Sequence, residues 1–324
     1  MKVNQIALKL IKYIRENQLF SASDHVVVAF SGGYDSLHLA TWLTDGSLPV
    51  DLQPRVSLVY INHGLRSDAD IEEAFVEDWL AAHGQRFENI MMAQMDWDEV
   101  PRSGVEGLAR ERRYEILQSY ADLWKASKVI TAHHRDDQAE TILFKLIRGS
   151  RLAQLAGMTP TITWNGMTIV RPLLQLAKHE LPNIVAQPIT HWIEDSTNAD
   201  LHYARNRIRR VILPEMRQIN SAVSDHIIDS ADQLTGMIAL AQQGISRGMV
   251  EIDAGQFDWQ QPENQVLLIL QSWLEKQHVY VVKDRQLQQV IQLMQNRSVA
   301  QGTVNLEAGL QVVREKSHLF VKHY

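Results

Sequence analysis

The chain of 324 residues contains no cysteine, and this absence excludes several kinds of chemistry. A protein without thiols has no disulfide, thiolate zinc site, cysteine nucleophile or persulfide carrier. Long hydrophobic runs are also missing, so no segment predicts a membrane span. The first apolar stretch, Ile6 to Ile14, is interrupted by Lys9 and Lys12 and lacks the continuous apolar core of a secretory signal. We therefore expect a soluble, cytoplasmic protein with no membrane partner.

Positive charge is in the minority, because 32 lysines and arginines stand against 38 acidic residues, for a net charge of -6. This balance argues against a general polyanion binder but leaves room for a local basic patch. The length exceeds that of a usual single domain, and an apolar fraction of 45% supports a substantial core. We expect two domains.

Apolar, β-branched runs alternate with segments of helical periodicity in the first half of the chain. Strands are predicted at Val26–Phe30, Val56–Ile61, Lys128–Ala132 and Asn89–Met92, and helices at Asp70–Ala82 and Val105–Ala126. Such alternation predicts an α/β fold with a doubly wound parallel sheet, covered by helices on both faces. The chemistry of such folds lies at the carboxyl ends of the strands.

The pattern changes twice further along the chain. Two short apolar runs on either side of Asn165-Gly166 predict a β-hairpin, which we interpret as an excursion from the sheet. After Pro214 we expect helices at 221–243 and 265–277 and strand-like alternation at 302–321. The hypothesis is a catalytic domain at 1–217 and a smaller, mostly helical accessory domain at 218–324.

The most informative motif, Ser31-Gly32-Gly33-Tyr34-Asp35-Ser36, directly follows the first strand and begins a helix. Unpaired N–H groups and the positive end of the helix dipole would meet there, which favours an anion. The glycines allow close backbone approach, the two serines supply hydroxyls, and Asp35 suits a magnesium-bound phosphate. An ordinary N-capped turn is the alternative. The motif resembles the loop of the N-type ATP pyrophosphatases, which implies ATP as substrate and an adenine nucleotide alpha hydrolase-like sheet.

A second polar segment, Thr131 to Thr141, joins another strand to a helix. Asp136 and Asp137 fall where acidic residues favour the helix dipole, so capping alone would explain them. Asp137 and Glu140 also share a helix face and could hold a cationic amine and help to deprotonate it. Both interpretations stay open. A metal site formed by His133, His134 and Asp136 is less favoured, because adjacent side chains on a regular element point apart.

A third cluster is basic: five arginines and one glutamate occur between Arg205 and Arg217. Arginines at this density often mark only a solvated helix face, but in an acidic protein they favour phosphate binding. A further charged helix starts near Glu106, whose side chain could simply pair with Arg110.

Taken together, these segments resemble the tRNA(Ile)-lysidine synthetases from about residue 26 to residue 214. Besides the phosphate loop, the matching segments are Asn62–Arg66, Glu106–Tyr114, Ala132–Thr141, Arg171–Leu174 and Trp192–Pro214. The resemblance implies that ATP adenylates the wobble cytidine, C34, of an isoleucine tRNA with a CAU anticodon. The ε-amine of free L-lysine then displaces AMP, giving lysidine, which reads AUA in place of AUG.

The resemblance also implies a role for each matched residue. ATP and Mg2+ would be held by Ser31, Gly32, Gly33, Tyr34, Asp35 and Ser36, with Asp136 as a second magnesium ligand. Lysine would bind Asp137 and Glu140, and the catalytic group would be Asp35, Arg113, His133, Asp137 and Arg205. The tRNA would contact Arg205, Arg207, Arg209 and Arg210. A homodimer is the assembly that the resemblance suggests.

Three features depart from the family pattern: Arg151, Pro182 inside an otherwise helical segment, and an early end to the chain. Rival functions fit less well. A tRNA thiolase needs cysteines, and NAD, GMP or asparagine synthetases need an amidotransferase partner domain. A noncatalytic ATP sensor would leave the arginine and carboxylate clusters without a purpose.

Overall fold

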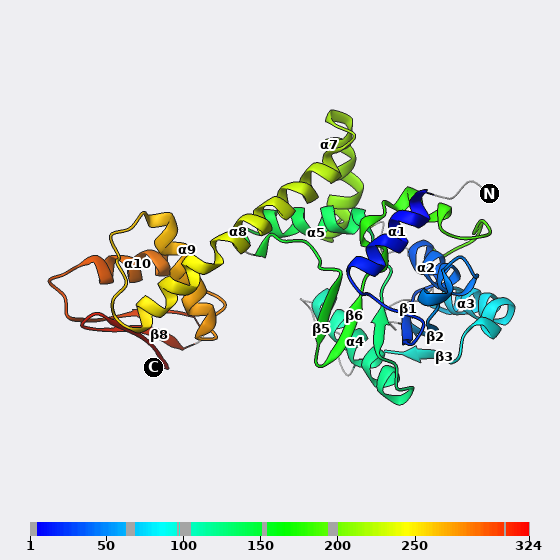
Figure 1. Ribbon diagram of the computed structural model, residues 1–324, viewed down its shortest axis with the longest axis horizontal. Helices are drawn as coiled ribbons and strands as arrows, with labels where there is room; N and C mark the ends of the chain where they lie inside the picture. Colours follow the sequence, from blue (N-terminus) through cyan, green and yellow to red (C-terminus); the bar gives the residue numbers. More distant parts are fainter. Residues whose placement is uncertain are drawn as a thin grey trace. The chain divides into compact units, whose positions relative to one another are not determined.

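The computed structural model describes residues 5–62, 69–95, 97, 105–150, 154–193, 200–307 and 309–323. The chain forms two compact units, Met1–Asp232 and Gln233–Tyr324, and the division falls inside the long helix α8 (Val223–Asp253) (Figure 1). Across these described ranges, no helix is both long and apolar enough to cross a membrane.

The first unit contains a six-stranded sheet of order β3-β2-β1-β4-β6-β5. Its strands are β1 (His25–Phe30), β2 (Arg55–Asn62), β3 (Ile90–Gln94), β4 (Lys128–Ile130), β5 (Thr161–Trp164) and β6 (Met167–Val170). All neighbours are parallel except β5 and β6, and Val28 of β1 lies opposite both Leu58 of β2 and Ile130 of β4. The predicted parallel sheet is confirmed.

The hairpin prediction is right about the turn and wrong about its place. Asn165 and Gly166 both have positive φ, as a tight two-residue hairpin turn requires. However, β6 pairs in parallel with β4, so the hairpin extends the main sheet instead of leaving it. The physical reason is burial: Met167, Ile169 and Val170 are all covered, which requires a neighbouring strand and a helix layer.

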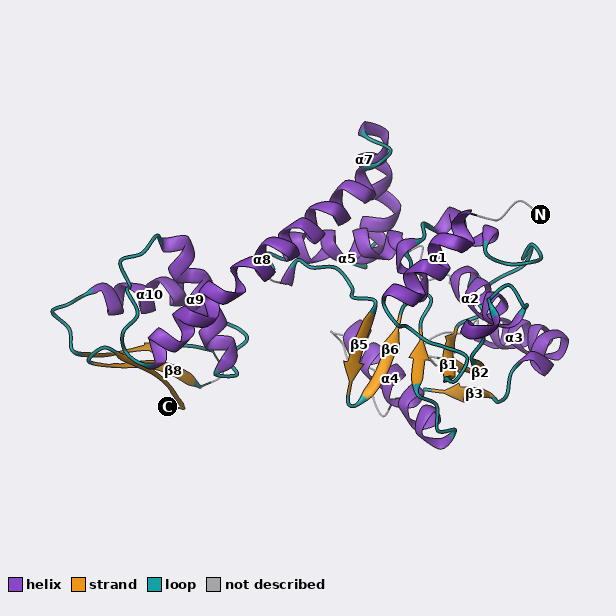
Figure 2. Cartoon of the chain, viewed as in Figure 1, coloured by secondary structure: helices purple, strands orange, loops and turns teal. Residues whose placement is uncertain are grey.

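Helices cover both faces of the sheet, as Figure 2 shows. They are α1 (Gln5–Glu16), α2 (Tyr34–Thr44), α3 (Ala69–His83), α4 (Val105–Leu123) and α5 (Arg135–Ile147), with short 3-10 segments at Val50–Leu52, Gly84–Arg86, Pro172–Gln175 and Lys178–Asn183. Residues of α1, α2 and α3 pack on the face that carries Val28, and those of α4 pack on the face that carries Val27. Alternate residues of one strand thus serve two cores.

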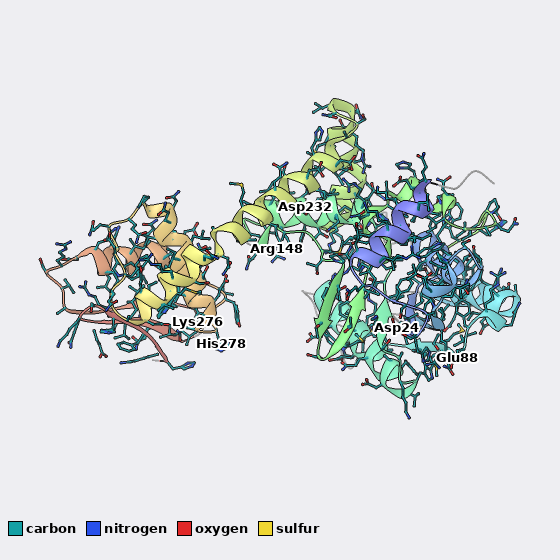
Figure 3. All side chains as sticks on the ribbon, viewed as in Figure 1. Asp24, Glu88, Arg148, Asp232, Lys276 and His278 are labelled. Carbon is teal, nitrogen blue, oxygen red and sulfur yellow. The ribbon has the colours of Figure 1, made fainter. Side chains whose placement is uncertain are left out.

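Ion pairs hold the amino-terminal edge of the sheet, where the parallel strands begin. Asp24 immediately precedes β1 and pairs with Lys128 of β4 at 2.9 Å, and Glu88, just before β3, pairs with Arg55 of β2 at 3.0 Å. Asp24 and Glu88 are labelled in Figure 3. This edge therefore carries structural contacts, which leaves the carboxyl edge for chemistry.

A helical segment closes the first unit. It consists of α6 (Ala204–Arg207), a π-helical turn (Ile208–Ile212) and α7 (Leu213–Ile219), followed by the start of α8. Ile208 and Leu213 pack with Ile142 and Leu143 of α5 and with Ile228 of α8. The arginine cluster is therefore mounted directly against the helix that carries Asp137 and Glu140.

The second unit has its own core. It contains α9 (Glu263–Lys276), α10 (Asp284–Gln295) and an antiparallel sheet of β7 (Gln301–Asn305), β8 (Leu310–Glu315) and β9 (His318–His323). Trp273 is buried among them and its indole N–H donates to Asp253 at 2.6 Å. Lys276, labelled in Figure 3, pairs with the same carboxylate at 2.8 Å. Helix α10, with its apolar positions 287, 290, 291 and 294, was not predicted.

Candidate active site

The site lies at the carboxyl ends of β1 and β4, two adjacent parallel strands. The chain leaves β1 toward β2 on one side, while β4 lies on the other side, so this is a point where the strand order reverses. Ligands of open α/β sheets bind at such a point. The loop after β1 is the predicted phosphate loop, and the segment after β4 carries His133 to Asp137. The two strongest motifs of the sequence therefore meet.

Gly32 has φ of +71°, which only glycine adopts without strain. A Cβ atom on it would lie 2.5 Å from Cδ1 of Ile193, whose own N–H donates to the carbonyl of Gly32 at 3.0 Å. Gly33 is the N-cap of α2 and has no side chain with which to accept from the first N–H groups of the helix. The first N–H groups of α2 are thus available for an anion, as a phosphate loop requires.

The hydroxyls of the loop hold its conformation. Ser36 is buried and its Oγ donates to the carbonyl of Gly33 at 3.0 Å, while lying 3.1 Å from Oγ of Ser31. The ring of Tyr34 packs edge-on against Trp192 and lies 5.3 Å from Nζ of Lys178. These contacts hold the loop at the carboxyl edge of the sheet.

Asp35 lies where the two motifs meet. Its Oδ2 is 3.5 Å from Nε2 of His134 and 3.4 Å from Nζ of Lys178. Burial raises the pKa of Asp35, but the hydrogen bonds and charges of His134 and Lys178 outweigh it, so the pKa is lowered. Its other oxygen, Oδ1, is buried and has no hydrogen-bond partner among the described residues. A buried carboxylate oxygen without a hydrogen-bond partner is well suited to bind a cation.

His134 is buried within 4 Å of three carboxylates, those of Asp35, Asp136 and Asp137. Burial lowers the pKa of His134, but these three negative groups outweigh it, so the pKa is raised. The imidazole turns a different ring nitrogen toward Asp35 and toward Asp136. It therefore separates the two residues that were expected to share a magnesium ion.

Asp136, the other residue expected to bind magnesium, has both oxygens in hydrogen bonds within the protein. Its Oδ1 accepts from Arg217 at 2.7 Å and its Oδ2 accepts from the backbone N–H of Lys178 at 2.8 Å. Throughout the described part of the chain, no group of three or more His, Cys, Asp or Glu residues is arranged to hold a metal. Of the two expected magnesium ligands, Asp35 has one oxygen without a hydrogen-bond partner among the described residues.

Asp137 and Glu140, here called the carboxylate pair, point to the same place. Arg209 binds both: its Nε donates to Glu140 at 2.6 Å, and its Nη2 donates to Glu140 at 2.8 Å and to Asp137 at 3.0 Å. The second oxygen of Asp137 accepts the backbone N–H of His134 at 2.9 Å and so caps α5. The carboxylate pair thus forms a cation site, and the cation in it is a side chain of this protein.

The chain is similar to known proteins over most of its length. Residues 3–216 match the family model of the PP-loop domain. A tRNA(Ile)-lysidine synthase of Lactiplantibacillus plantarum is 30% identical over 318 residues, which cover 94% of this chain and 68% of that protein. The chain belongs to the tRNA(Ile)-lysidine synthase family. The resemblance stated from the sequence is confirmed.

Other members of the lysidine synthase family are similar to the chain. The Streptococcus thermophilus protein is 29% identical over 313 residues, covering 97% of this chain and 70% of the relative. The Streptococcus pyogenes serotype M1 protein is 32% identical over 295 residues, covering 89% and 63%. Among solved structures, the U34-tRNA thiolase NcsA from Methanococcus maripaludis matches with a TM-score of 0.55 and 14% identity, covering 71% of this chain and 80% of that one. This last likeness shows the fold alone.

In this lysidine synthase family member, the side chain of His133 has different surroundings from that of His134: the charges that act on it include those of arginines. Its Nδ1 is 2.8 Å from Oγ1 of Thr131. Burial lowers the pKa of His133, Asp137 opposes the shift, and Arg171, Arg113 and Arg110 lower it further, so the ring is neutral at pH 7. Burial and the charges of Arg110 and Arg205 likewise lower the pKa of Arg113, although Tyr114 opposes them. His133 and these arginines form an electropositive region next to the carboxylate pair.

The four arginines predicted to bind tRNA have different surroundings. Arg205 lies 5.7 Å from the ring of Phe144. Arg209 is committed to the carboxylate pair. Arg207 and Arg210 are exposed, and no ion pair involving either occurs among the described residues. The remaining matched segments, 63–66 and 194–199, together with Arg151 and the side chain of Glu106, lie outside what the structure describes.

The sequence reasoning missed two groups. Lys178 reaches Asp35 across 143 positions of sequence, and no local pattern indicates such a contact. Arg171 falls in a segment that resembles the family but was given no role; its side chain is buried and its Nη1 donates to the carbonyl of Thr159 at 2.7 Å. A buried arginine directly after an apolar strand was the available signal for Arg171, because arginines are seldom covered without a purpose.

Proposed function

We propose that this chain is an ATP-dependent, AMP-forming carbon–nitrogen ligase that makes lysidine. It joins the ε-amine of free L-lysine to C2 of cytidine C34 in an isoleucine tRNA with a CAU anticodon and releases AMP and pyrophosphate. The change shifts codon reading from AUG to AUA and tRNA identity from methionine to isoleucine. The observation that carries the proposal is the meeting of an open phosphate loop and a ready-made cation site at one edge of the sheet.

The first chemical step is adenylation of the cytidine. The C2 oxygen attacks the α-phosphorus of ATP, and pyrophosphate leaves. The backbone N–H groups at the start of α2 are suited to hold the phosphates. A magnesium ion, which neutralises phosphate charge, would be held by Asp35 through its unpartnered Oδ1. Arg113, whose charge acts on neutral His133, and Arg205, whose charge acts on Arg113, would stabilise the charge that develops on the oxygens.

The second step is attack by lysine. Its ε-nitrogen forms a bond to C2, and the C2 oxygen leaves as part of AMP. An amine with an ordinary pKa near 10.4 must first lose a proton. Burial raises the pKa of Glu140, although Arg209 opposes the shift, which makes this carboxylate a better proton acceptor than an exposed one. The carboxylate pair can therefore both hold a cationic amine and take its proton.

Contacts with the tRNA are assigned to the exposed arginines Arg207 and Arg210, with Arg205 nearer the reacting groups. We assign residues 218–324 to an accessory domain that binds tRNA. We also propose that the protein assembles as a homodimer. Since tRNA, ATP and free lysine meet in the cytoplasm, the reaction belongs there.

The test is lysine incorporation. Purified protein with ATP, Mg2+ and radiolabelled lysine should label an isoleucine transcript with a CAU anticodon. A transcript with adenosine at position 34, which lacks a C2 carbonyl, is the matched control and should stay unlabelled. Binding of ATP without any labelling would overturn the proposal in favour of an ATP sensor.

A further inference from the structure

The carboxylate pair holds a guanidinium through three hydrogen bonds. Arg209 donates twice to Glu140 and once to Asp137, all within 3.0 Å. The Glu140 side chain is only 6% exposed and that of Asp137 19%, whereas that of Arg209 is 42% exposed. Buried carboxylates without a compensating cation would destabilise the fold. Arg209 therefore allows both carboxylates to stay ionised and holds them in position. The same contacts exclude a second cation.

The neighbouring carboxylates are also balanced. Asp35 faces His134 and Lys178, and Asp136 faces Arg217. A lysine ammonium that entered this region with every internal cation in place would find both carboxylates of the pair already hydrogen-bonded to Arg209. Like charges at such distances repel. An internal cation must therefore leave when a cationic substrate binds to the carboxylate pair.

Arg209 is the cation that has to leave, because it is hydrogen-bonded to both carboxylates of the pair. Its neighbour Ile208 is buried and anchors the backbone, while the Arg209 side chain reaches the carboxylates from the solvent side. Both residues belong to the π-helical turn Ile208–Ile212, a rare conformation that often marks functional positions. Departure needs only side-chain rotation. The released guanidinium would join a run in which Arg207 and Arg210 are already exposed.

We propose that Arg209 holds the place of the lysine amine between Asp137 and Glu140, and that lysine displaces it toward the phosphates of the tRNA. This inference rests on the proposed function and makes Arg209 a specificity-determining residue: only a substrate with a cationic group can replace it. Thermodynamic linkage then requires lysine and tRNA to strengthen each other's binding. The alternative is that Arg209 stays in place and binds the carboxylate of the substrate.

The first test is Arg209→Gln, with Arg15→Gln as a control that removes the same charge from an exposed ion pair on α1. Removing an internal competitor should lower the KM for lysine about ten-fold, as when a binding-competent state rises from about one tenth to full population. Arg15→Gln should leave that KM within about two-fold of the unaltered enzyme. A raised or unchanged KM in Arg209→Gln would overturn the inference, and a raised KM would favour the alternative.

The second test uses guanidinium chloride at low millimolar concentration as a probe. In Arg209→Ala the free ion should enter the vacated site and inhibit competitively with lysine. In the unaltered enzyme the tethered side chain has a much higher effective concentration, so the same dose should have no effect. Equal inhibition of both proteins, or of neither, would count against the inference.

The third test needs no variant and decides the question if the Arg209 variants do not fold. Without ATP, lysine should tighten tRNA binding to the unaltered protein several-fold, and norleucine, which lacks the ε-amine, should do so less. Absence of this coupling would overturn the inference. If the unaltered enzyme incorporates no lysine at all, the proposed function fails; if it does so without coupling, only the role of Arg209 fails.

Discussion

Individual carboxylate oxygens carry most of the information at the residue scale. Asp137 uses one oxygen to accept the N–H of His134 at the start of α5 and the other to accept from Arg209. Capping and cation binding are therefore compatible functions of one side chain. Asp35 divides in the same way, with Oδ2 facing cations and Oδ1 left without a partner among the described residues.

Asp137→Asn separates the two functions of this side chain. The amide oxygen can still accept from His134, but the negative charge is lost. We expect the KM for lysine to rise at least about ten-fold, the loss of one charged hydrogen bond, while ATP affinity changes less than about two-fold. Steady-state kinetics and ATP titration measure the two effects. Asp136→Asn removes the same charge one residue away; an equal rise in that variant would mean that only net charge matters.

Gly32→Ala should remove ATP binding while leaving the fold intact. The substitution combines a positive φ with a Cβ that would lie 2.5 Å from Ile193. Gly33→Ala is the matched control, because Gly33 has φ of -76° and its Cβ would lie 3.3 Å from Oγ of Ser31 and 3.7 Å from the carbonyl oxygen of Ile193. We expect a loss of ATP affinity of more than about ten-fold for the first variant and a much smaller one for the second. Similar affinities would show that the loop geometry is not required.

At the scale of elements, packing sets how far a periodic pattern extends. The helix predicted at 221–243 continues to Asp253 in α8 and contributes to the cores of both units, through Ile228 in one and Ile252 in the other. Two glycines of α8 lie in different surroundings. A Cβ on Gly236 would meet nothing within 4 Å, whereas on Gly248 it would lie 2.8 Å from two atoms of Ile269.

These glycines predict opposite effects on stability. Gly236→Ala should raise the free energy of unfolding by roughly 0.5–1 kcal/mol, because alanine loses less backbone entropy in a helix. Gly248→Ala should lower it by about 1–3 kcal/mol, because α8 and α9 would have to move apart. Chemical denaturation followed by circular dichroism checks both. Stabilisation by Gly248→Ala would show that Ile269 can change rotamer freely.

Charge distribution matters most at the scale of the whole molecule. The chain is acidic overall, with a net charge of -6, so a general attraction to RNA cannot account for tRNA binding. The exposed Arg207 and Arg210 stand close to the carboxyl edge of the sheet, on the segment that packs against α5. A local basic surface on an acidic protein concentrates the tRNA backbone at one place.

The double variant Arg207→Gln and Arg210→Gln tests this distribution. A plot of log affinity for tRNA against log salt concentration has a negative slope. Each lost phosphate contact should make this slope less steep by about 0.7–0.9. Lys12→Gln with Arg15→Gln removes the same charge from α1, where both side chains are in exposed ion pairs. Binding titrations at several salt concentrations should show the change in the first variant only. Equal changes in both would indicate a general field.

Local patterns determined much of this protein. The apolar runs predicted β1 and β2 to within one residue at each end, because strands covered on both faces need continuous β-branched sequence. The glycines of the phosphate loop and the Asn165-Gly166 turn were equally readable, since each is a backbone conformation that few other residues adopt. The resemblance of the motifs, in order, then led to the family.

Only the tertiary structure decided which groups meet. Asp137 and Arg209 are 72 residues apart, and Asp35 and Lys178 are 143 apart, so no periodicity connects them. The sheet joined the hairpin to β4 because its apolar residues needed cover, and the helices joined an arginine predicted to bind tRNA to the carboxylates predicted to bind lysine. Sequence determines which charges a chain carries; folding selects their partners, because pairing depends on distance and burial.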